Sequence, residues 1–174
     1  MSVPLPFSST PFPPPLDGSM GFDVTEPVAW SAYQRDFPAN ATLPEINGDN
    51  IQVRRAPHPA NPFREHTYWH MVTHDEKEGV PNEALRRPDI NRLVRIPWAR
   101  PLLESYLGPE VKRWREVLHG RWTLHIWHTR VNYILVLREQ DKGLFLITSF
   151  CPAPQKVTTY HTRWSAAKKA RHTF

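Results

Sequence analysis

The chain has 174 residues, a formal net charge of +5, 19 prolines and one cysteine. This length suits one domain of ordinary size plus an extension. The single Cys151 excludes an intrachain disulfide framework and a cysteine-based metal cluster. No apolar run approaches the roughly 20 residues that a membrane span needs, and the beginning lacks the basic and apolar parts of a secretion signal. We therefore expect a soluble, cytoplasmic protein with no membrane partner.

Proline crowds the first third of the chain, because twelve of the 19 prolines precede residue 63. Proline lacks the backbone donor of helices and sheets, so this composition disfavours helices and central strands. Residues 1–20 have the composition of a flexible or polyproline-type tail, whereas the aromatics of 21–62 predict loops draped over the domain. We therefore divide the chain into a Pro-rich, acidic and partly disordered extension, 1–62, and a folded domain, 63–174.

Charge is distributed unevenly along the chain. Residues 1–85 carry five Lys/Arg against eleven Asp/Glu, whereas residues 86–130 carry ten against four. The segment from Lys156 onward adds five basic residues and no acid. Such asymmetry favours a polyanionic partner for the second half. The alternative is that the acidic front folds against the basic back.

The most informative stretch is "FREHTYWHMVTHDE", in which His66, His70 and His74 are spaced four apart. On a helix, residues four apart lie about 6 Å from each other and can share a metal ion. The Thr, Tyr, Trp and Val content favours a strand over 67–73 instead, on which His66 and His70 are about 13 Å apart. The strand interpretation predicts three separate histidines on one face, no shared metal ion and no cofactor.

Three short helices are expected between the histidine stretch and the sheet. In chain order, the first has helical spacing of its residues, the second has a proline in its first turn, where proline is tolerated, and the third has a stripe of apolar residues that ends at a glycine. The predicted helices cover 90–94, 100–107 and 109–118.

The remainder predicts an antiparallel sheet. Three apolar strands with turn residues between them form a meander over 121–129, 131–139 and 143–150. The middle strand alternates Ile134 and Val136 with Tyr133, Leu135 and Leu137, so both of its faces are apolar and covered. The basic end, 163–174, either forms a helix or trails off. The fold class is α+β, a small antiparallel sheet packed against helices with a Pro-rich N-terminal extension.

Because the common catalytic motifs are absent, histidine and arginine side chains are the main candidates for catalysis. No phosphate-binding glycine loop, nucleophile elbow or two-histidine metalloprotease helix has the right spacing. Histidine exchanges a proton near neutral pH, and arginine holds phosphate oxygens while staying charged. These are the minimum parts for metal-free RNA cleavage, in which a base removes the 2′-hydroxyl proton and cations hold the developing charge.

The candidates for RNA contact add two aromatic rings on which bases can stack and several basic side chains. They are Arg86, Arg87, Trp98, Tyr68, Lys168 and Lys169. Each candidate also has an ordinary structural role: a histidine hydrogen-bonded within a sheet, an ion-paired arginine, a core tryptophan or a β-forming threonine. The joint pattern carries more information than any one residue.

Four motifs resemble a known group of proteins: "YWH" (68–70), "RPDINRLVRIPW" (87–98), "NYILVL" (132–137) and "FLITSF" (145–150). Bacterial and prophage-encoded members of the barnase–EndoU–colicin–RelE-like superfold of metal-independent ribonucleases show the same order. The resemblance covers residues 66–165 and leaves the first third unexplained. It implies a RelE-like α+β fold.

The resemblance also implies roles for individual residues. His70 would be the main acid–base residue, Arg92 and Arg95 would contact the scissile phosphate, and Thr148 would lie at the site on the last strand. His66, on the same predicted face as His70, is a further candidate catalytic residue. Ser149 and Phe150 stand where the group has Ala and Tyr, so this chain lacks the hydroxyl of that tyrosine.

We therefore expect a metal-independent endoribonuclease of toxin type that acts on tRNA or messenger RNA. An antitoxin or immunity protein is a possible partner through the N-terminal extension. One rival is a non-catalytic RNA-binding or phage-interaction module of the same fold. A second rival is a metal-dependent hydrolase that combines the histidines with Asp75 or Glu76.

Overall fold

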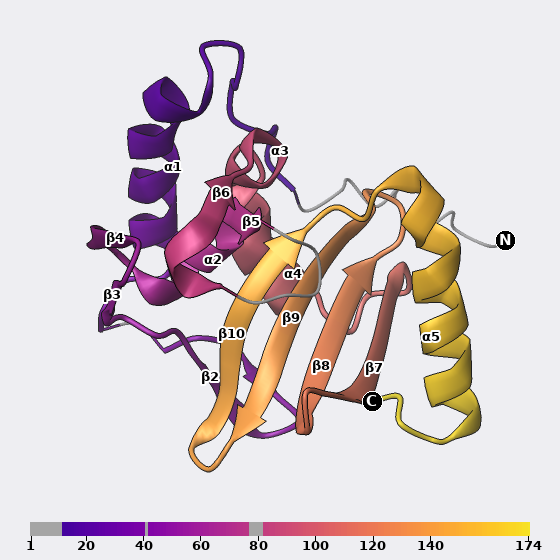
Figure 1. Cartoon of the computed structure of the whole chain (residues 1–174). Helices are drawn as coiled ribbons and strands as arrows, with labels where there is room; N and C mark the ends of the chain where they lie inside the picture. The colour runs from indigo at the N-terminus through magenta and orange to yellow at the C-terminus, as the bar shows by residue number, and fades with distance from the viewer. Residues whose placement is uncertain (1–11, 41, 77–81) are drawn as a thin grey trace, which may run out of the picture.

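The structure, a computed structural model, describes residues 12–40, 42–76 and 82–174. It is a mixed α+β fold in which helices pack against one main sheet (Figure 1). The helices and 3₁₀ turns are α1 (Phe22–Asp36), α2 (His66–Val72), η1 (Glu83–Leu85), α3 (Ile90–Leu93), η2 (Ile96–Trp98), α4 (Ala99–Glu104), η3 (Pro154–Lys156) and α5 (Val157–Lys169). Among the described residues, no helix is long and apolar enough to cross a membrane.

Six strands form the main sheet in the order β1-β2-β10-β9-β8-β7, and two short hairpins pair β3 with β4 and β5 with β6. The strands are β1 (Glu45–Ile46), β2 (Asp49–Gln52), β3 (Pro57–His58), β4 (Asn61–Glu65), β5 (Thr73–Asp75), β6 (Arg86–Pro88), β7 (Val111–Leu118), β8 (Arg121–His128), β9 (Tyr133–Gln140) and β10 (Gly143–Phe150). The predicted antiparallel meander is confirmed for β8, β9 and β10. On its open side, β2 joins β10 in parallel.

The meander has a fourth strand where the sequence predicted a helix. Residues 109–118 do not form that helix, because Val111–Leu118 pairs along its whole length with β8. His119 and Gly120 both have positive φ, so they make a two-residue turn that suits a tight hairpin. The spacing of apolar side chains fits both structures here, and the hairpin decides between them. The helices predicted over 90–94 and 100–107 are confirmed as α3 and α4, each slightly shorter.

Strand β9 separates two apolar layers, as its alternation predicted. Tyr133, Leu135 and Leu137 belong to the main core, which also includes residues of α1, α2, α3 and α4. Ile134 and Val136 belong to a second cluster with Ala167 of α5. The C-terminal segment is thus a helix, and Figure 1 shows α5 in yellow beside β7, away from the other helices.

The proline-rich front contains a long helix, so the expectation that it has none is wrong. Helix α1 holds Pro27 internally. Ala29 and Tyr33 of α1 and the capping residue Phe37 follow a four-residue spacing and have no exposed surface. This burial compensates for the backbone bond that Pro27 cannot make.

The rest of the front also belongs to the fold. Residues 1–11 of the predicted tail lie outside the described residues. The amide of Leu16 donates to the carbonyl of Val94, so 12–20 pack against the body of the protein. Ile46 and Ile51 are buried in the main core. The predicted boundary after residue 62 falls inside β4.

Residues 66–72 form helix α2, and the strand predicted over 67–73 is wrong. The buried residues Thr67, Tyr68, Met71 and Val72 recur at the spacing of one helix face. The hydroxyl of Thr67 donates to the carbonyl of Leu146 and accepts from the amide of Arg54, which fixes α2 against the sheet. This periodicity of 3.6 was present in the sequence, but the β-branched and aromatic composition masked it.

Candidate functional site

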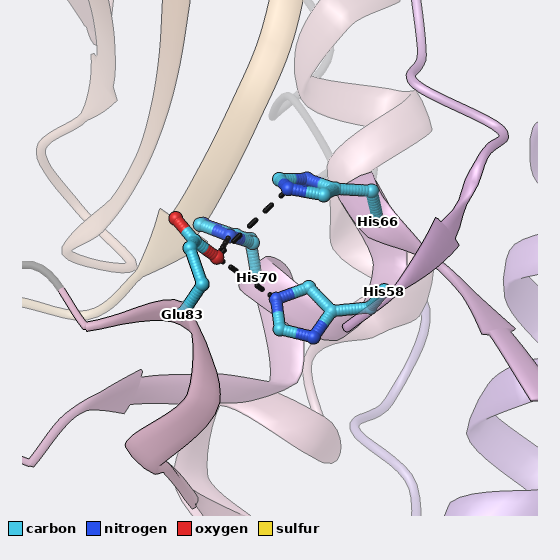
Figure 2. A group of neighbouring side chains, drawn as sticks. All are labelled: His58, His66, His70 and Glu83. Atoms are coloured by element: carbon cyan, nitrogen blue, oxygen red, sulfur yellow. Dashed lines mark hydrogen bonds and ion pairs between the residues drawn. The ribbon is translucent and has the colours of Figure 1, made fainter. Parts of the chain in front are cut away.

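Helix α2 brings His66 and His70 together. They lie one turn apart on the same helix, and their rings stack with centroids 4.5 Å apart and planes 15° apart. Figure 2 shows both rings directed toward the side chain of Glu83. The separation of about 13 Å that a strand would give does not apply. The geometric reason for excluding a shared ion is therefore gone.

Two residues that the sequence did not single out complete the cluster. His58 comes from β3 and Glu83 from η1. Glu83 Oε2 lies 2.6 Å from His70 Nε2, 2.9 Å from His58 Nε2 and 3.8 Å from His66 Nε2. The four side chains each offer one ligand atom, and these atoms lie within 4.8 Å of one another. We call His58, His66, His70 and Glu83 the histidine cluster.

The hydrogen-bond partners define where each ring carries its proton. The amide of Ala60 donates to Nδ1 of His58, so the neutral ring of His58 carries its proton on Nε2 and donates it to Glu83. His70 Nε2 likewise donates to the Glu83 carboxylate. At His66 the relation is reversed, because Arg54 can only donate and its NH1 lies 3.2 Å from Nε2. His66 Nε2 therefore presents a lone pair.

Burial and neighbouring cations keep the histidines neutral near pH 7. Burial, and then the charge of Arg86, lower the pKa of His70 to about 4. Burial, and then the charge of Arg54, lower the pKa of His66 as well. For Glu83, burial raises the pKa, but the charge and hydrogen bond of His70 outweigh it and lower the pKa overall. The cluster thus holds an ionised carboxylate among neutral imidazoles.

Thr148 and Arg92 lie beside α2 and support it. Thr148 Oγ1 donates to the main-chain carbonyl of His70 at 2.8 Å. Arg92 NH1 donates to the carbonyl of Thr73 at 2.7 Å and to Thr148 Oγ1 at 3.3 Å. The structure therefore brings these two predicted residues together with His70, but through its backbone. Arg92 also forms an ion pair with Asp89.

A hollow of about 440 Å³ is lined in part by Arg92. Its lining combines charged and aromatic side chains, including Arg92, Asp75, Asp89, Phe150 and Tyr160. The Arg92 guanidinium lies over the Phe150 ring, 5.4 Å from its centroid. Phe150 thus closes one side of Arg92.

The remaining arginine candidates have partners within the protein. Arg86 donates to Thr73 and Asp75, and its side chain is only 6% exposed, so the predicted RNA contact at this residue is wrong. Arg87 is exposed and paired with Glu76. Arg95 donates to the carbonyl of Asn91 and lies over the ring of Trp98.

The predicted stacking rings lie away from the histidine cluster or inside the core. Tyr68 has no exposed surface and donates to the carbonyl of Glu26, so no base can stack on it and that prediction is wrong. Trp98 donates to the carbonyl of Pro13, and Phe12 packs against its ring. This part of the N-terminal segment therefore covers the ring of Trp98, on which an RNA base was predicted to stack.

Lys168 and Lys169 are exposed on the last turn of α5. Helix α5 packs against β7, whereas α2 packs against β10, and β8 and β9 lie between those strands. The structure therefore does not bring the two lysines to the histidine cluster.

Many basic residues of the second half are neutralised by acids. Two of these pairs join the acidic front to the basic back: Arg86 with Asp75 and Arg87 with Glu76. Others form within the second half: Arg92 with Asp89, Arg100 with Glu104, Arg115 with Glu139 and Arg163 with Glu116. The alternative, in which the acidic front folds against the basic back, thus holds for these two pairs. The polyanionic partner of the second half stays a prediction.

Sequence reasoning missed His58, Glu83 and Arg54. His58 lies between two prolines and Glu83 lies in a polar stretch of the chain, so no regular spacing connects either residue with α2. Only the helix assignment of 66–72 would have pointed to a shared partner for His66 and His70.

No family model matches the chain, and no curated protein or solved structure matches it. Its activity therefore has to be inferred from the chemistry of its own residues.

Proposed function

We propose that the protein is a metal-independent endoribonuclease of toxin type, which cleaves tRNA or messenger RNA by attack of a 2′-hydroxyl on the adjacent phosphate. One observation carries the proposal: the stacked rings of His66 and His70 have opposite partners at Nε2. Arg54 donates to His66, whereas Glu83 accepts from His70. A neutral imidazole lone pair beside an exposed cation is what removal of a proton next to a phosphate needs.

In this proposal Arg54 binds the phosphate and His66 is the base. Arg54 is exposed, and its bond to His66 is a hydrogen bond that a phosphate oxygen can replace. Moving Arg54 onto the phosphate frees Nε2 of His66 and places the substrate next to it. The assignment of the base thus moves from His70, as the family resemblance implies, to its stacking partner.

In this reaction one histidine, His66, serves first as the base and then as the acid. His66 Nε2 takes the 2′-hydroxyl proton, the 2′-oxygen bonds to phosphorus, and the bond from phosphorus to the 5′-oxygen breaks. The imidazolium formed on His66 is 3.8 Å from the Glu83 carboxylate, which stabilises its charge. It gives its proton to the departing 5′-oxygen and returns to the neutral form, leaving a 2′,3′-cyclic phosphate.

His70, His58 and Glu83 position the base in this mechanism. Glu83 accepts from both His70 and His58, so its carboxylate is held beside His66 by two donors. The ring of His70 then provides the surface on which His66 stacks. Removing either donor should loosen the carboxylate and disturb the ring of His66.

The broader family proposal rests on the antiparallel meander and on the helices packed against one of its faces. Both agree with a RelE-like nuclease of the barnase–EndoU–colicin–RelE-like superfold. As a toxin the protein would act in the cytoplasm, where its RNA substrates are. An antitoxin or immunity protein would contact the N-terminal segment, which packs over Trp98.

The test uses the full chain, a short RNA and EDTA. We expect cleavage with a cyclic phosphate product, and a loss of roughly 10²–10⁴-fold in rate for His66→Ala. His74→Ala is the matched control, because His74 lies in the same stretch but its Nδ1 contacts the carbonyl of Asp75 instead of the cluster. A substrate with one 2′-deoxy sugar at the cleavage position should bind and stay intact.

Three outcomes would contradict the proposal. Cleavage of the 2′-deoxy substrate would exclude attack by the 2′-hydroxyl. A wild-type cleavage rate for His66→Ala would show that His66 is not the base. RNA binding without any cleavage would favour the non-catalytic RNA-binding module, which the closure of Arg92 by Phe150 also favours.

A further inference from the structure

We propose that the histidine cluster is also a binding site for a divalent transition metal, with Zn²⁺ as its preferred ion, and that the bound metal inhibits the protein. Nε2 of His66, Nε2 of His70 and the Glu83 carboxylate would be the three ligands. The proposed metal site does not depend on the proposed ribonuclease function. The proposed inhibition does, because it requires RNA cleavage that the metal can inhibit.

The distances in the cluster are close to those of a tetrahedral zinc site. Zn²⁺ binds imidazole nitrogens at about 2.0–2.1 Å, so neighbouring ligand atoms of a tetrahedral site are about 3.3 Å apart. The carboxylate oxygen of Glu83 lies 2.6 Å from His70 Nε2 and 3.8 Å from His66 Nε2, which brackets that value. All ligand atoms of the cluster lie within 4.8 Å of one another, so side-chain movements without a backbone rearrangement would form the site. Helix α2 already fixes both imidazoles on one face.

The type of ligand selects the type of metal. Two imidazoles and one carboxylate suit zinc and similar first-row ions, whereas Mg²⁺ prefers oxygen ligands. The side chains of His66 and His70 are 14% and 12% exposed, and that of Glu83 is 45% exposed. An ion can thus enter from the side of Glu83 and keep one position for water.

His58 is expected to support the site from outside the coordination shell, although its Nε2 is near the other ligand atoms. The amide of Ala60 occupies the lone pair on Nδ1, so Nε2 carries the proton of the neutral ring. A protonated nitrogen cannot bind a metal ion, but it can donate to the carboxylate that does. His70 differs from His58 in that its ring can bind the ion through Nε2 by taking the tautomer with the proton on Nδ1, whereas the bond from Ala60 blocks that tautomer in His58. Such outer-shell donors orient metal-binding carboxylates.

Arg54 opposes the metal. Its guanidinium occupies the lone pair of His66, and its charge repels a cation. Because Arg54 is exposed, it can swing into solvent when the ion binds, at a cost in affinity. Arg54→Ala should therefore bind Zn²⁺ more tightly than the wild type. An ordinary hydrogen-bonded cluster with no metal function would not show this gain.

Metal binding and proton transfer need the same lone pair. A zinc ion on Nε2 of His66 removes the base that the proposed ribonuclease uses, so the two states exclude each other. Zinc should lower the rate of RNA cleavage in proportion to the occupied fraction of the protein, and EDTA should restore it.

The test is calorimetric titration of the full chain with Zn²⁺, with Mg²⁺ as the negative control. We expect one site. We also expect Glu83→Gln and His66→Ala to weaken binding by more than about 100-fold, beyond the roughly 10–100-fold typical of an outer-shell substitution, which His58→Ala should show. His74→Ala should leave the affinity unchanged. Glu83→Gln keeps the side-chain size, so it tests the ligand even if a histidine variant folds poorly.

The outcomes separate the metal site from the function. Absence of the site in the wild type, or unchanged affinity in Glu83→Gln, would overturn the metal proposal. If His58→Ala lost as much Zn²⁺ affinity as His66→Ala, the outer-shell role of His58 would be overturned. Zinc binding in a protein that cleaves no RNA would leave the site standing and the function refuted. Faster cleavage with zinc would overturn inhibition and support the metal-dependent hydrolase.

Discussion

The hydroxyl of Thr148 donates a 2.8 Å hydrogen bond to the main-chain carbonyl of His70. This bond joins the last strand of the main sheet to the helix that carries the stacked histidines. The same hydroxyl accepts from Arg92, so one threonine side chain connects β10, α2 and α3. The site therefore depends on a residue that touches none of its ring nitrogens.

The first prediction concerns this connection. Thr148→Val keeps the side-chain shape but leaves the carbonyl of His70 and one donor of Arg92 with one partner fewer. We expect the free energy of unfolding to fall by about 1–3 kcal/mol, the usual cost of an unsatisfied buried polar group. Urea unfolding measures it.

The control for that variant is Thr162→Val on α5. Its hydroxyl donates to the carbonyl of Thr158 within the helix and is exposed. Substitutions at such surface positions usually stay within about 0.5 kcal/mol. If both valine variants lose the same stability, the bond from Thr148 to His70 has no special role.

The second prediction concerns the cation beside His66. If Arg54 holds the scissile phosphate, Arg54→Ala should slow RNA cleavage by roughly 10²–10³-fold, the range for loss of one charge-stabilising donor. Cleavage rates at saturating RNA measure it, and Arg54→Lys should recover part of the rate by keeping the charge. Arg35→Ala is the control, since Arg35 is an exposed arginine paired with Asp36 on α1. An equal loss in both would point to general charge attraction.

The third prediction tests whether the proline-rich front is part of the domain. Phe37 has no exposed surface and stacks on Tyr33 in the main core. Phe37→Ala should therefore cost about 3–5 kcal/mol of stability. Phe63→Ala should cost less than about 0.5 kcal/mol, because Phe63 is 82% exposed. Thermal unfolding compares the two. Similar melting temperatures would mean that the front contributes little to the core.

The elements that were predicted correctly are those specified by residues close together in the sequence. Strand β9, which contains Ile134, has an alternating apolar pattern, and the turn after it has typical turn residues, and both were predicted. The strand Val111–Leu118 was missed because its apolar residues also fit a helix, and only pairing with β8 decides between the two. Helix α1 was missed because Pro27 outweighed the buried spacing of Ala29 and Tyr33.

The site was predictable only in part for a related reason. Thr148 bonds to the backbone of His70, and Arg92 bonds to Thr148. The family resemblance suggested these three residues, whereas the element type of the histidine stretch was predicted wrongly. His58 and Glu83 reach α2 from short elements with no periodic signal, so their contact with the histidines depends on tertiary structure alone. The mistaken strand then concealed the one geometry, a helical turn, that makes a shared carboxylate possible.

The last prediction concerns the far side of the sheet, where Glu116 ties α5 to the meander. Arg163 Nε donates to Glu116 Oε2 at 2.9 Å, and Trp114 Nε1 donates to Oε1 at 2.8 Å. His125 Nε2 lies 2.9 Å from the same carboxylate. Burial raises the pKa of Glu116, but the hydrogen bonds from His125, Arg163 and Trp114 outweigh it and lower the pKa to about 2.

A carboxyl whose pKa is lower in the folded state than in the unfolded chain stabilises the fold above its unfolded value and loses that effect as pH falls. With an unfolded pKa near 4.5 and a folded pKa of about 2, Glu116 should contribute on the order of 3 kcal/mol at pH 7. Glu116→Gln should therefore be less stable at pH 7, and the gap to the wild type should narrow as pH falls from 4.5 toward 2.

Urea unfolding at several pH values measures this gap. Glu104→Gln is the control, since Glu104 pairs with Arg100 on the surface with its side chain 54% exposed, and surface ion pairs contribute little. The difference between each variant and the wild type cancels the titration of groups that do not contact the substituted carboxylate. A gap that stays constant with pH would show that Glu116 acts through packing alone. A gap that widens on acidification would contradict the lowered pKa, because protonation must weaken bonds that only the carboxylate accepts.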